Sequence, residues 1–187
     1  TTEIAEGLFA GCTGIEQITI PDTVTVIESG AFGGCINLKE IVVPDNVTEI
    51  QSSAFEYCSS LKTVKLSENL ERIGVYAFGD CDVLKSIKIP DSVLDIDGAA
   101  FAECKELSDV VLSKNLKTMG WQVFGNDNKL TEIEIPKSLE ECRYYRNNDS
   151  IDGGTFDNCA NLKTVMFEDG TTEIAEGLFA GCTGIEQ

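Results

Sequence analysis

The sequence contains no histidine. Histidine is the usual general base near neutral pH and the commonest metal ligand in proteins, so its absence disfavours most hydrolytic mechanisms and most metal sites. The acidic clusters Asp95-Ile96-Asp97 and Asn126-Asp127-Asn128 lack the spacing and the glycine of a calcium loop. We therefore expect no enzyme, no cofactor and no bound metal.

Positive charge is also scarce, because 14 basic residues stand against 32 acidic ones and give a formal net charge of -18. Nucleic acid and anionic membrane surfaces would repel such a chain, which leaves neutral or cationic partners. No apolar run approaches the roughly 20 residues of a membrane helix, and the sequence begins with neither a basic segment nor an apolar signal core. We expect no membrane insertion.

What the chain does have is a repeat of 23 residues, which predicts a single solenoid over residues 1–187. Its coils start at residues 1, 24, 47, 70, 93, 116 and 139, the last of these with nine extra residues, and a partial coil starts at 171. Position 9 is phenylalanine throughout: Phe9, Phe32, Phe55, Phe78, Phe101, Phe124, Phe156 and Phe179. Positions 4, 15, 18 and 20 are apolar, with Ile151 assigned to position 4 of the seventh coil. Constant apolar columns indicate that every coil buries the same side chains.

Each coil combines two periodicities. Residues 40–43 alternate inward and outward side chains, as in a short strand, and Pro44 ends that strand because proline lacks a donor. Phe32 and Cys35 are three residues apart, which favours a helical turn, and residues 47–50 suggest a shorter extended piece on the outer side. The predicted fold is an α/β repeat solenoid: a curved, right-handed coil stack with a parallel sheet on its concave face and short helical or 3-10 turns on its convex side.

The cysteines follow the same repeat. Position 12 holds Cys12, Cys35, Cys58, Cys81, Cys104, Cys159 and Cys182, with Asp127 in the sixth coil; Cys142 lies outside the column. No Cys-x-x-Cys pair is present, which disfavours zinc. Stacked cysteines could come within disulfide range, but their Cβ vectors should run parallel. We expect buried free thiols with weak hydrogen bonds to the backbone.

The coil consensus resembles the 23-residue leucine-rich repeat of the BspA-like family. The residues that carry the resemblance are Val24, Ile27, Gly30-Ala31-Phe32, Cys35, Leu38, Ile41 and Val43-Pro44, and it covers essentially the whole chain. It implies a secreted or surface-anchored bacterial protein that adheres to host matrix or plasma proteins. The family supplies no catalytic residues. Asp127, Met119 and the expanded seventh coil depart from its pattern.

Residues 1–17 recur unchanged as residues 171–187. Because the other coils have diverged strongly from one another, this identity needs a separate cause, either a recent natural duplication of a 170-residue block or deliberate engineering. Neither end shows a polar capping coil, so apolar edges should be exposed there. End-to-end self-association is expected from these edges.

Two surfaces are candidates for binding a partner. One is the strand row at position 19, with Val42, Lys65, Lys88 and Val111; the other is the insertion, with Arg143, Tyr144, Tyr145 and Arg146. Solenoids commonly bind through the strand face, and arginine and tyrosine are enriched at interface hot spots. The alternative interpretations are that the lysines of position 16, beside the acidic residues of position 22, form a solvated charge ladder, and that the tyrosines only cover the core. Trp121 is interpreted first as a packing residue or a scattered surface residue, and only second as an anchor for a partner.

These observations favour an extracellular protein-binding or adhesion module from a larger bacterial surface protein. The alternative is a passive spacer in a multidomain surface protein, which has no specific ligand. An enzymatic function is the least favoured interpretation, because no nucleophile, base and orienting group can be assembled from these residues.

Overall fold

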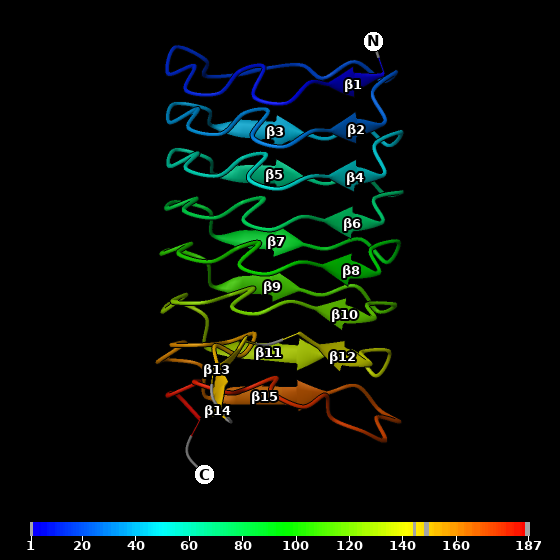
Figure 1. Cartoon of the computed structure of the whole chain (residues 1–187), viewed down its shortest axis with the longest axis vertical. Helices are drawn as coiled ribbons and strands as arrows, with labels where there is room; N and C mark the ends of the chain where they lie inside the picture. Colours follow the sequence, from blue (N-terminus) through cyan, green and yellow to red (C-terminus); the bar gives the residue numbers. More distant parts are fainter. Residues whose placement is uncertain (1, 144, 148–149, 186–187) are drawn as a thin grey trace.

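The chain is a stack of coils, one for each repeat (Figure 1). The computed structural model describes residues 2–143, 145–147 and 150–185. The phenylalanines of position 9 form one column, with neighbouring ring centroids 5.1 to 5.7 Å apart and ring planes within 16° of parallel. Phe32, Phe55, Phe78, Phe101, Phe124 and Phe156 are fully buried. The predicted common interior of the coils is confirmed.

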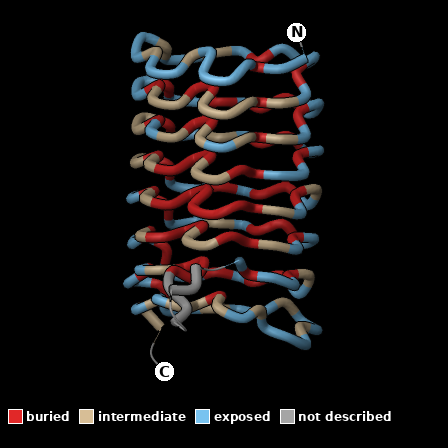
Figure 2. Tube along the Cα trace, viewed as in Figure 1, coloured by how far each residue is buried: buried red, intermediate tan, exposed pale blue. Residues whose placement is uncertain are grey.

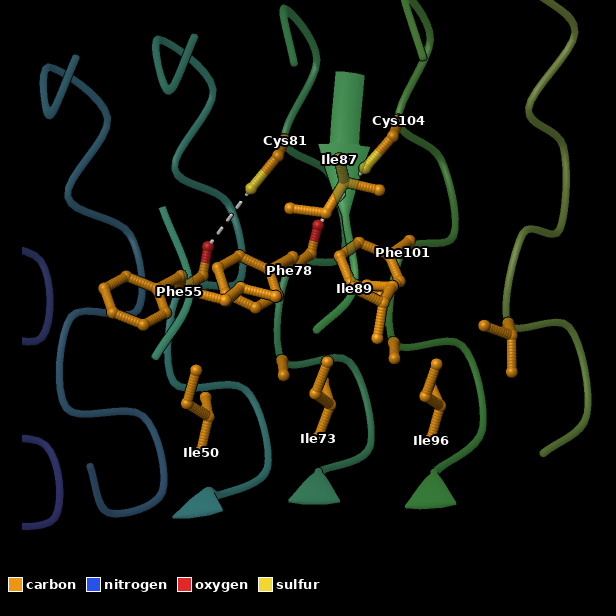
Figure 3. Packing of buried hydrophobic residues seen from close by; sticks show 14 of the residues in the cluster. Ile50, Phe55, Ile73, Phe78, Cys81, Ile87, Ile89, Ile96, Phe101 and Cys104 are labelled. Carbon is orange, nitrogen blue, oxygen red and sulfur yellow. Dashed lines mark hydrogen bonds between the residues drawn. The ribbon is translucent and has the colours of Figure 1, made fainter. Parts of the chain in front are cut away.

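Position 3 and position 4 of the coils form the longest continuous sheet. Its seven parallel strands, each of two residues, are β1 (Glu3–Ile4), β2 (Val26–Ile27), β4 (Glu49–Ile50), β6 (Arg72–Ile73), β8 (Asp95–Ile96), β10 (Thr118–Met119) and β12 (Glu141–Cys142). The isoleucines of position 4 stack above one another and point into the core, as Ile50, Ile73 and Ile96 do in Figure 3. The segment predicted as a minor extended piece is therefore the most continuous ladder of the fold.

The strands predicted at positions 17 to 19 are present, but they form three separate parallel pairs. These pairs are β3 (Glu40–Val42) with β5 (Thr63–Lys65), β7 (Ser86–Lys88) with β9 (Asp109–Val111), and β11 (Glu132–Ile135) with β15 (Thr164–Phe167). Their outward positions are exposed, and β5 and β7 are neighbours although they belong to different pairs. We call the surface formed by these strands the sheet face. Its predicted curvature and the right-handed winding stay predictions.

The predicted helical turns are wrong, because the described residues contain strands and turns but no helix. In coil after coil the backbone at positions 7 and 11 is left-handed, for example at Ser53 (φ 57°) and Tyr57 (φ 61°). A right-handed helix needs a φ near −63°, so two left-handed residues four apart prevent one. Short turn bonds within the coil, such as the Glu56 amide to the Ser53 carbonyl at 3.1 Å, are supplemented by bonds between coils. The amides of Ser53 and Phe55 donate to the carbonyls of Val75 and Ala77 at 2.8 Å.

The insertion of the seventh coil begins one residue later than the sequence alignment suggested. Cys142, not Ile151, is paired with Met119 of the preceding coil, so the cysteine occupies the inward position 4 and is buried. The inserted residues form an antiparallel hairpin of β13 (Tyr145–Asn147) and β14 (Ser150–Asp152), in which Ile151 is opposite Arg146. A small apolar thiol thus replaces the aliphatic side chain where the chain leaves the regular path.

The two copies of the 17-residue segment are packed differently. Ile4 is 6% exposed and its counterpart Ile174 is 60% exposed, whereas Leu8 is 55% exposed and its counterpart Leu178 is 2% exposed. Figure 2 shows buried segments through the central coils and exposed ones in the first and last. The first copy has a following coil against it and the second a preceding one, so each leaves a different face open.

Candidate functional site

The position-19 residues form one row across four successive strands of the sheet face. Val42 is directly opposite Lys65 in the pair β3–β5, and Lys88 is directly opposite Val111 in the pair β7–β9. Both lysines are exposed, and the valines are 57% and 50% exposed, which is high for β-branched aliphatic side chains within strands. The structure therefore brings these four predicted residues together. We call them the valine–lysine row.

A hollow lies beside each valine of the row. The hollow at Val42 has a volume of about 360 Å³ and is also lined by Ile18, Ile20 and Pro44. The hollow at Val111 has a volume of about 260 Å³ and is also lined by Leu112 and Pro136. Both hollows also have polar walls, with Asp22 and Glu40 at the first and Lys114, Glu134 and Glu168 at the second. Sequence reasoning could not find these hollows, because they are formed between coils. Each valine of the row thus offers an apolar contact at the edge of a partly polar hollow.

The predicted residues of the insertion are at a different place on the solenoid. Arg143 directly follows β12 of the seven-stranded ladder, and Tyr145 and Arg146 belong to β13 of the hairpin. Tyr144 is outside the described residues, and the same holds for the side chains of Tyr145 and Arg146. The two predicted sets therefore lie on different strands: the valine–lysine row on the sheet face, and the insertion residues after β12 and in β13.

Arg143 is an anchor of the seventh coil. Its Nη1 is 3.1 Å from Asp97 Oδ1 and 3.5 Å from Asp95 Oδ1, two coils earlier. The other oxygen of Asp97 accepts from Arg72 Nη2 at 2.6 Å, and this hydrogen bond is the main reason that the pKa of Arg72 is raised. Asp97 is almost fully buried, so removing either arginine would leave its carboxylate poorly compensated. The 46-residue separation of Asp97 and Arg143, two repeat lengths, is a signal that sequence reasoning missed.

The position-12 cysteines are structural. The thiol of Cys81 donates to the carbonyl of Phe55 in the preceding coil (Figure 3), and Cys58 donates to Phe32 in the same way at 3.3 Å. Burial raises the pKa of the Cys58 thiol to about 12 and that of Cys142 to about 11. Thiols with such pKa values stay protonated at neutral pH and are poor nucleophiles. All eight cysteines are free, as expected, although Cys12 and Cys182 at the ends are only half-buried.

Asp127 replaces the cysteine of the sixth coil and is fully buried. Its Oδ1 accepts from the amide of Cys104 at 2.8 Å, whereas its Oδ2 is buried without a hydrogen-bond partner. Burial is the main cause that raises the pKa of this carboxyl well above its ordinary range, against a smaller opposite effect of the Cys104 amide. The protonated, neutral form is therefore favoured inside the fold.

We expect Asp127 to make the protein less stable as pH rises. Its folded pKa lies above the unfolded one, so its stabilising contribution is complete below about pH 4 and is lost as pH rises toward the folded value, by about 1.4 kcal/mol per unit of pKa difference. Asp127→Asn should remove this loss and raise the free energy of unfolding at pH 7 by about 1 to 3 kcal/mol, with a smaller gain at pH 4. Urea unfolding at both pH values measures the gain in the free energy of unfolding, and the same substitution at the exposed Asp109 is the control. An equal gain at both pH values would contradict the assignment.

The described residues contain no group of three histidine, cysteine, aspartate or glutamate side chains arranged to hold a metal ion. They also contain no helix long and apolar enough to cross a membrane. Trp121 packs as expected, because it makes an edge-to-face contact with Tyr76 at 5.7 Å and covers the backbone of Gly98.

Comparison with known proteins gives one family. The family model described as "BspA type Leucine rich repeat region" matches in six copies, over residues 2–96, 31–147 and 138–187. No curated protein sequence matches the chain.

Several solved structures are similar along most of the chain. A leucine-rich repeat protein from Bacteroides ovatus is 29% identical, with a TM-score of 0.74 over 98% of this chain and 57% of that one. The Treponema pallidum leucine-rich repeat protein is 27% identical, with a TM-score of 0.73 over 92% and 76%. A leucine-rich cell surface protein from Faecalibacterium prausnitzii is 28% identical, with a TM-score of 0.57 over 99% and 56%. The chain thus spans little more than half of the first and third of these proteins.

Proposed function

Because this chain belongs to the BspA-type leucine-rich repeat family, we propose that it is an extracellular protein-binding module, acting in adhesion or recognition within a longer bacterial surface protein. The family's repeat fold is typically a non-enzymatic scaffold. The localisation is supported by the Faecalibacterium prausnitzii relative, which is described as a cell surface protein.

The observation that carries the proposal is the valine–lysine row with a hollow at each end. Apolar side chains exposed on rigid strands beside concave surfaces are typical of binding sites, since a partner can bury them without reorganising the backbone. A host matrix or plasma protein is the expected class of ligand. The insertion, with Arg143, Tyr144, Tyr145 and Arg146, is a second candidate surface, on which the tyrosines would be the contact residues. End-to-end self-association is a further proposal, supported by the exposed Leu8 and Ile174, and sedimentation velocity at rising concentration tests it.

The test is a surface-plasmon titration of the immobilised chain against a panel of matrix and plasma proteins. For a ligand of the sheet face, we expect Val42→Ser combined with Val111→Ser to weaken binding about tenfold or more, which is at least about 1.4 kcal/mol. For a ligand of the insertion, we expect Tyr144→Ala combined with Tyr145→Ala to cause the same loss of affinity. Arg143 is left unchanged because it anchors Asp97.

The matched control is Ile36→Ser combined with Leu94→Ser, which removes two exposed aliphatic side chains from other parts of the surface. A loss of affinity as large in this control would argue against a defined site. Absence of saturable binding to every protein of the panel would favour the alternative, a passive spacer.

A further inference from the structure

Three of the four lysine ion pairs among the described residues follow the repeat, and the fourth, Lys137 with Glu168, joins positions one residue out of register. Lys39 pairs with Glu16 at 2.6 Å, Lys105 pairs with Asp82 at 2.8 Å, and Lys117 pairs with Glu140. In each case the two residues are 23 apart, so they occupy the same position in neighbouring coils. A lysine in such a stack is neutralised when its column has an acid in the adjacent coil.

Four lysines on the third and fourth coils have no acidic residue at the same position of an adjacent coil. They are Lys62 and Lys85 at position 16 and Lys65 and Lys88 at position 19, and all four are exposed. Within the described part of the chain, none of the four forms an ion pair. Their columns bring lysine beside lysine on coils whose phenylalanine rings are 5.1 Å apart. Like charges on neighbouring strands are destabilising, so fold stability does not account for this cluster.

Acidic side chains border the cluster but do not enter it. Position 17 holds Glu40 and Asp109 on the flanking coils, and Thr63 and Ser86 on the two lysine coils. At position 22, Asp45 and Asp91 accept from the backbone amides of Glu68 and Lys114 at 3.1 and 3.0 Å, and the side chain of Glu68 forms no ion pair with the four lysines. The positive surface is therefore only two coils wide, and an exposed valine with its hollow lies on each side.

We propose that the valine–lysine row binds an extended acidic peptide segment of a partner protein, in which one acidic side chain is flanked by an apolar side chain two residues away on either side. This inference rests on the proposed function and names the chemistry of its ligand. The carboxylate lies between Lys65 and Lys88, and the apolar side chains lie against Val42 and Val111, at the inner edges of the two hollows.

The spacing of the row agrees with this pattern. Val42 and Val111 are three coils apart, which is about 14 Å at the usual strand spacing, and an extended chain covers about 13 Å in four residues. Side chains two residues apart point the same way in an extended chain, so residues 1, 3 and 5 of such a segment face the row together. A segment with several consecutive acids fits less well, because Glu40 and Asp109 would repel the outer ones.

The net charge of -18 does not prevent this binding. At physiological ionic strength the Debye length is about 8 Å, so acidic residues farther than this from the row are largely screened. The lysines that touch the ligand dominate the local field. Binding should therefore weaken as salt is raised.

The experiment is fluorescence anisotropy with a labelled peptide that carries the core Leu-Ser-Glu-Ser-Leu, titrated with the full chain. We expect saturable binding that is lost in Lys65→Glu combined with Lys88→Glu and weakened about tenfold in Val42→Ser combined with Val111→Ser. The matched control, Lys129→Gln combined with Lys163→Gln, removes two exposed lysines that lie outside the cluster and form no ion pair within the described residues. It should bind as the parent chain does. Lys65→Gln combined with Lys88→Gln should weaken binding while its Tm stays equal or rises.

Several results would overturn the proposal. The first is an absence of saturable peptide binding. The second is equal affinity for a peptide with glutamine in place of glutamate. The third is an equal loss of peptide affinity in the control variant. Heparin is the second probe: if it competes and the valine substitutions have no effect, the cluster binds sulfated polyanions by charge alone and the peptide proposal fails. If a protein of the panel binds regardless of Lys65→Glu combined with Lys88→Glu, the proposed function stands and only this inference falls.

Discussion

Replacing Phe78 by alanine should lower the free energy of unfolding by about 4 kcal/mol. Phe78 is fully buried between Phe55 and Phe101, with ring centroids 5.1 and 5.3 Å away, so the substitution leaves a cavity that both neighbouring coils line. Stability in a coil stack is carried by contacts between nearest neighbours. The cavity therefore weakens two interfaces in the middle of the stack, and urea unfolding followed by circular dichroism measures the loss.

The matched control is Phe9→Ala, the same change in the first coil. Phe9 is half-buried and stacks on only one described ring, that of Phe32, at 5.2 Å. Its loss should cost roughly half as much or less, because one interface is affected and part of the ring is already in water. Equal costs at both positions would contradict an interior built from successive phenylalanine contacts.

Replacing Gly120 by alanine should cost about 3 kcal/mol, at the upper end for overpacking of a well-packed interior. An added Cβ would lie 2.2 Å from the amide nitrogen of Gly98 in the preceding coil, and the obstacle is backbone that cannot rotate away. Coils five and six would have to separate locally, which would lengthen the hydrogen bond between the Gly120 amide and the Ile96 carbonyl, now 2.8 Å.

Gly14→Ala is the control for this change, because a Cβ added there would meet nothing within 4 Å. Its effect on the unfolding midpoint in urea should be close to zero. A neutral Gly120→Ala would mean that neighbouring coils can move apart at no cost, in conflict with the tight stacking of the seven-stranded ladder.

The repeat made much of this architecture predictable. A 23-residue period with constant phenylalanine and aliphatic columns leaves one way to bury every coil, which is to stack them in register. The cysteine column was readable for the same reason, since parallel side chains in equivalent places exclude disulfides and leave thiols bonded to backbone carbonyls. The exposed row of Val42, Lys65, Lys88 and Val111 followed from strand alternation alone.

The turns and the insertion were not predictable in the same way. Glycine marks the left-handed positions in the second coil, at Gly30 and Gly34, but the third coil adopts the same backbone with Ser53 and Tyr57. Local backbone preference disfavours a tyrosine in the left-handed conformation. The hydrogen bonds to the next coil stabilise this conformation, and they exist only when the coils are stacked. The same applies to Cys142, whose inward position is decided by pairing with Met119.

By itself, the sequence determined the period, the buried columns and the outward strand residues, because those properties repeat and each repeat confirms the others. Tertiary structure decided what depends on the neighbouring coil: the left-handed turns, the hollows beside Val42 and Val111, and the link between Arg143 and Asp97. The duplicated segment shows the division most directly, since Leu8 is exposed and Leu178 is buried in identical sequences. Burial is a property of contacts, and contacts along a stack come from residues a whole repeat or more away.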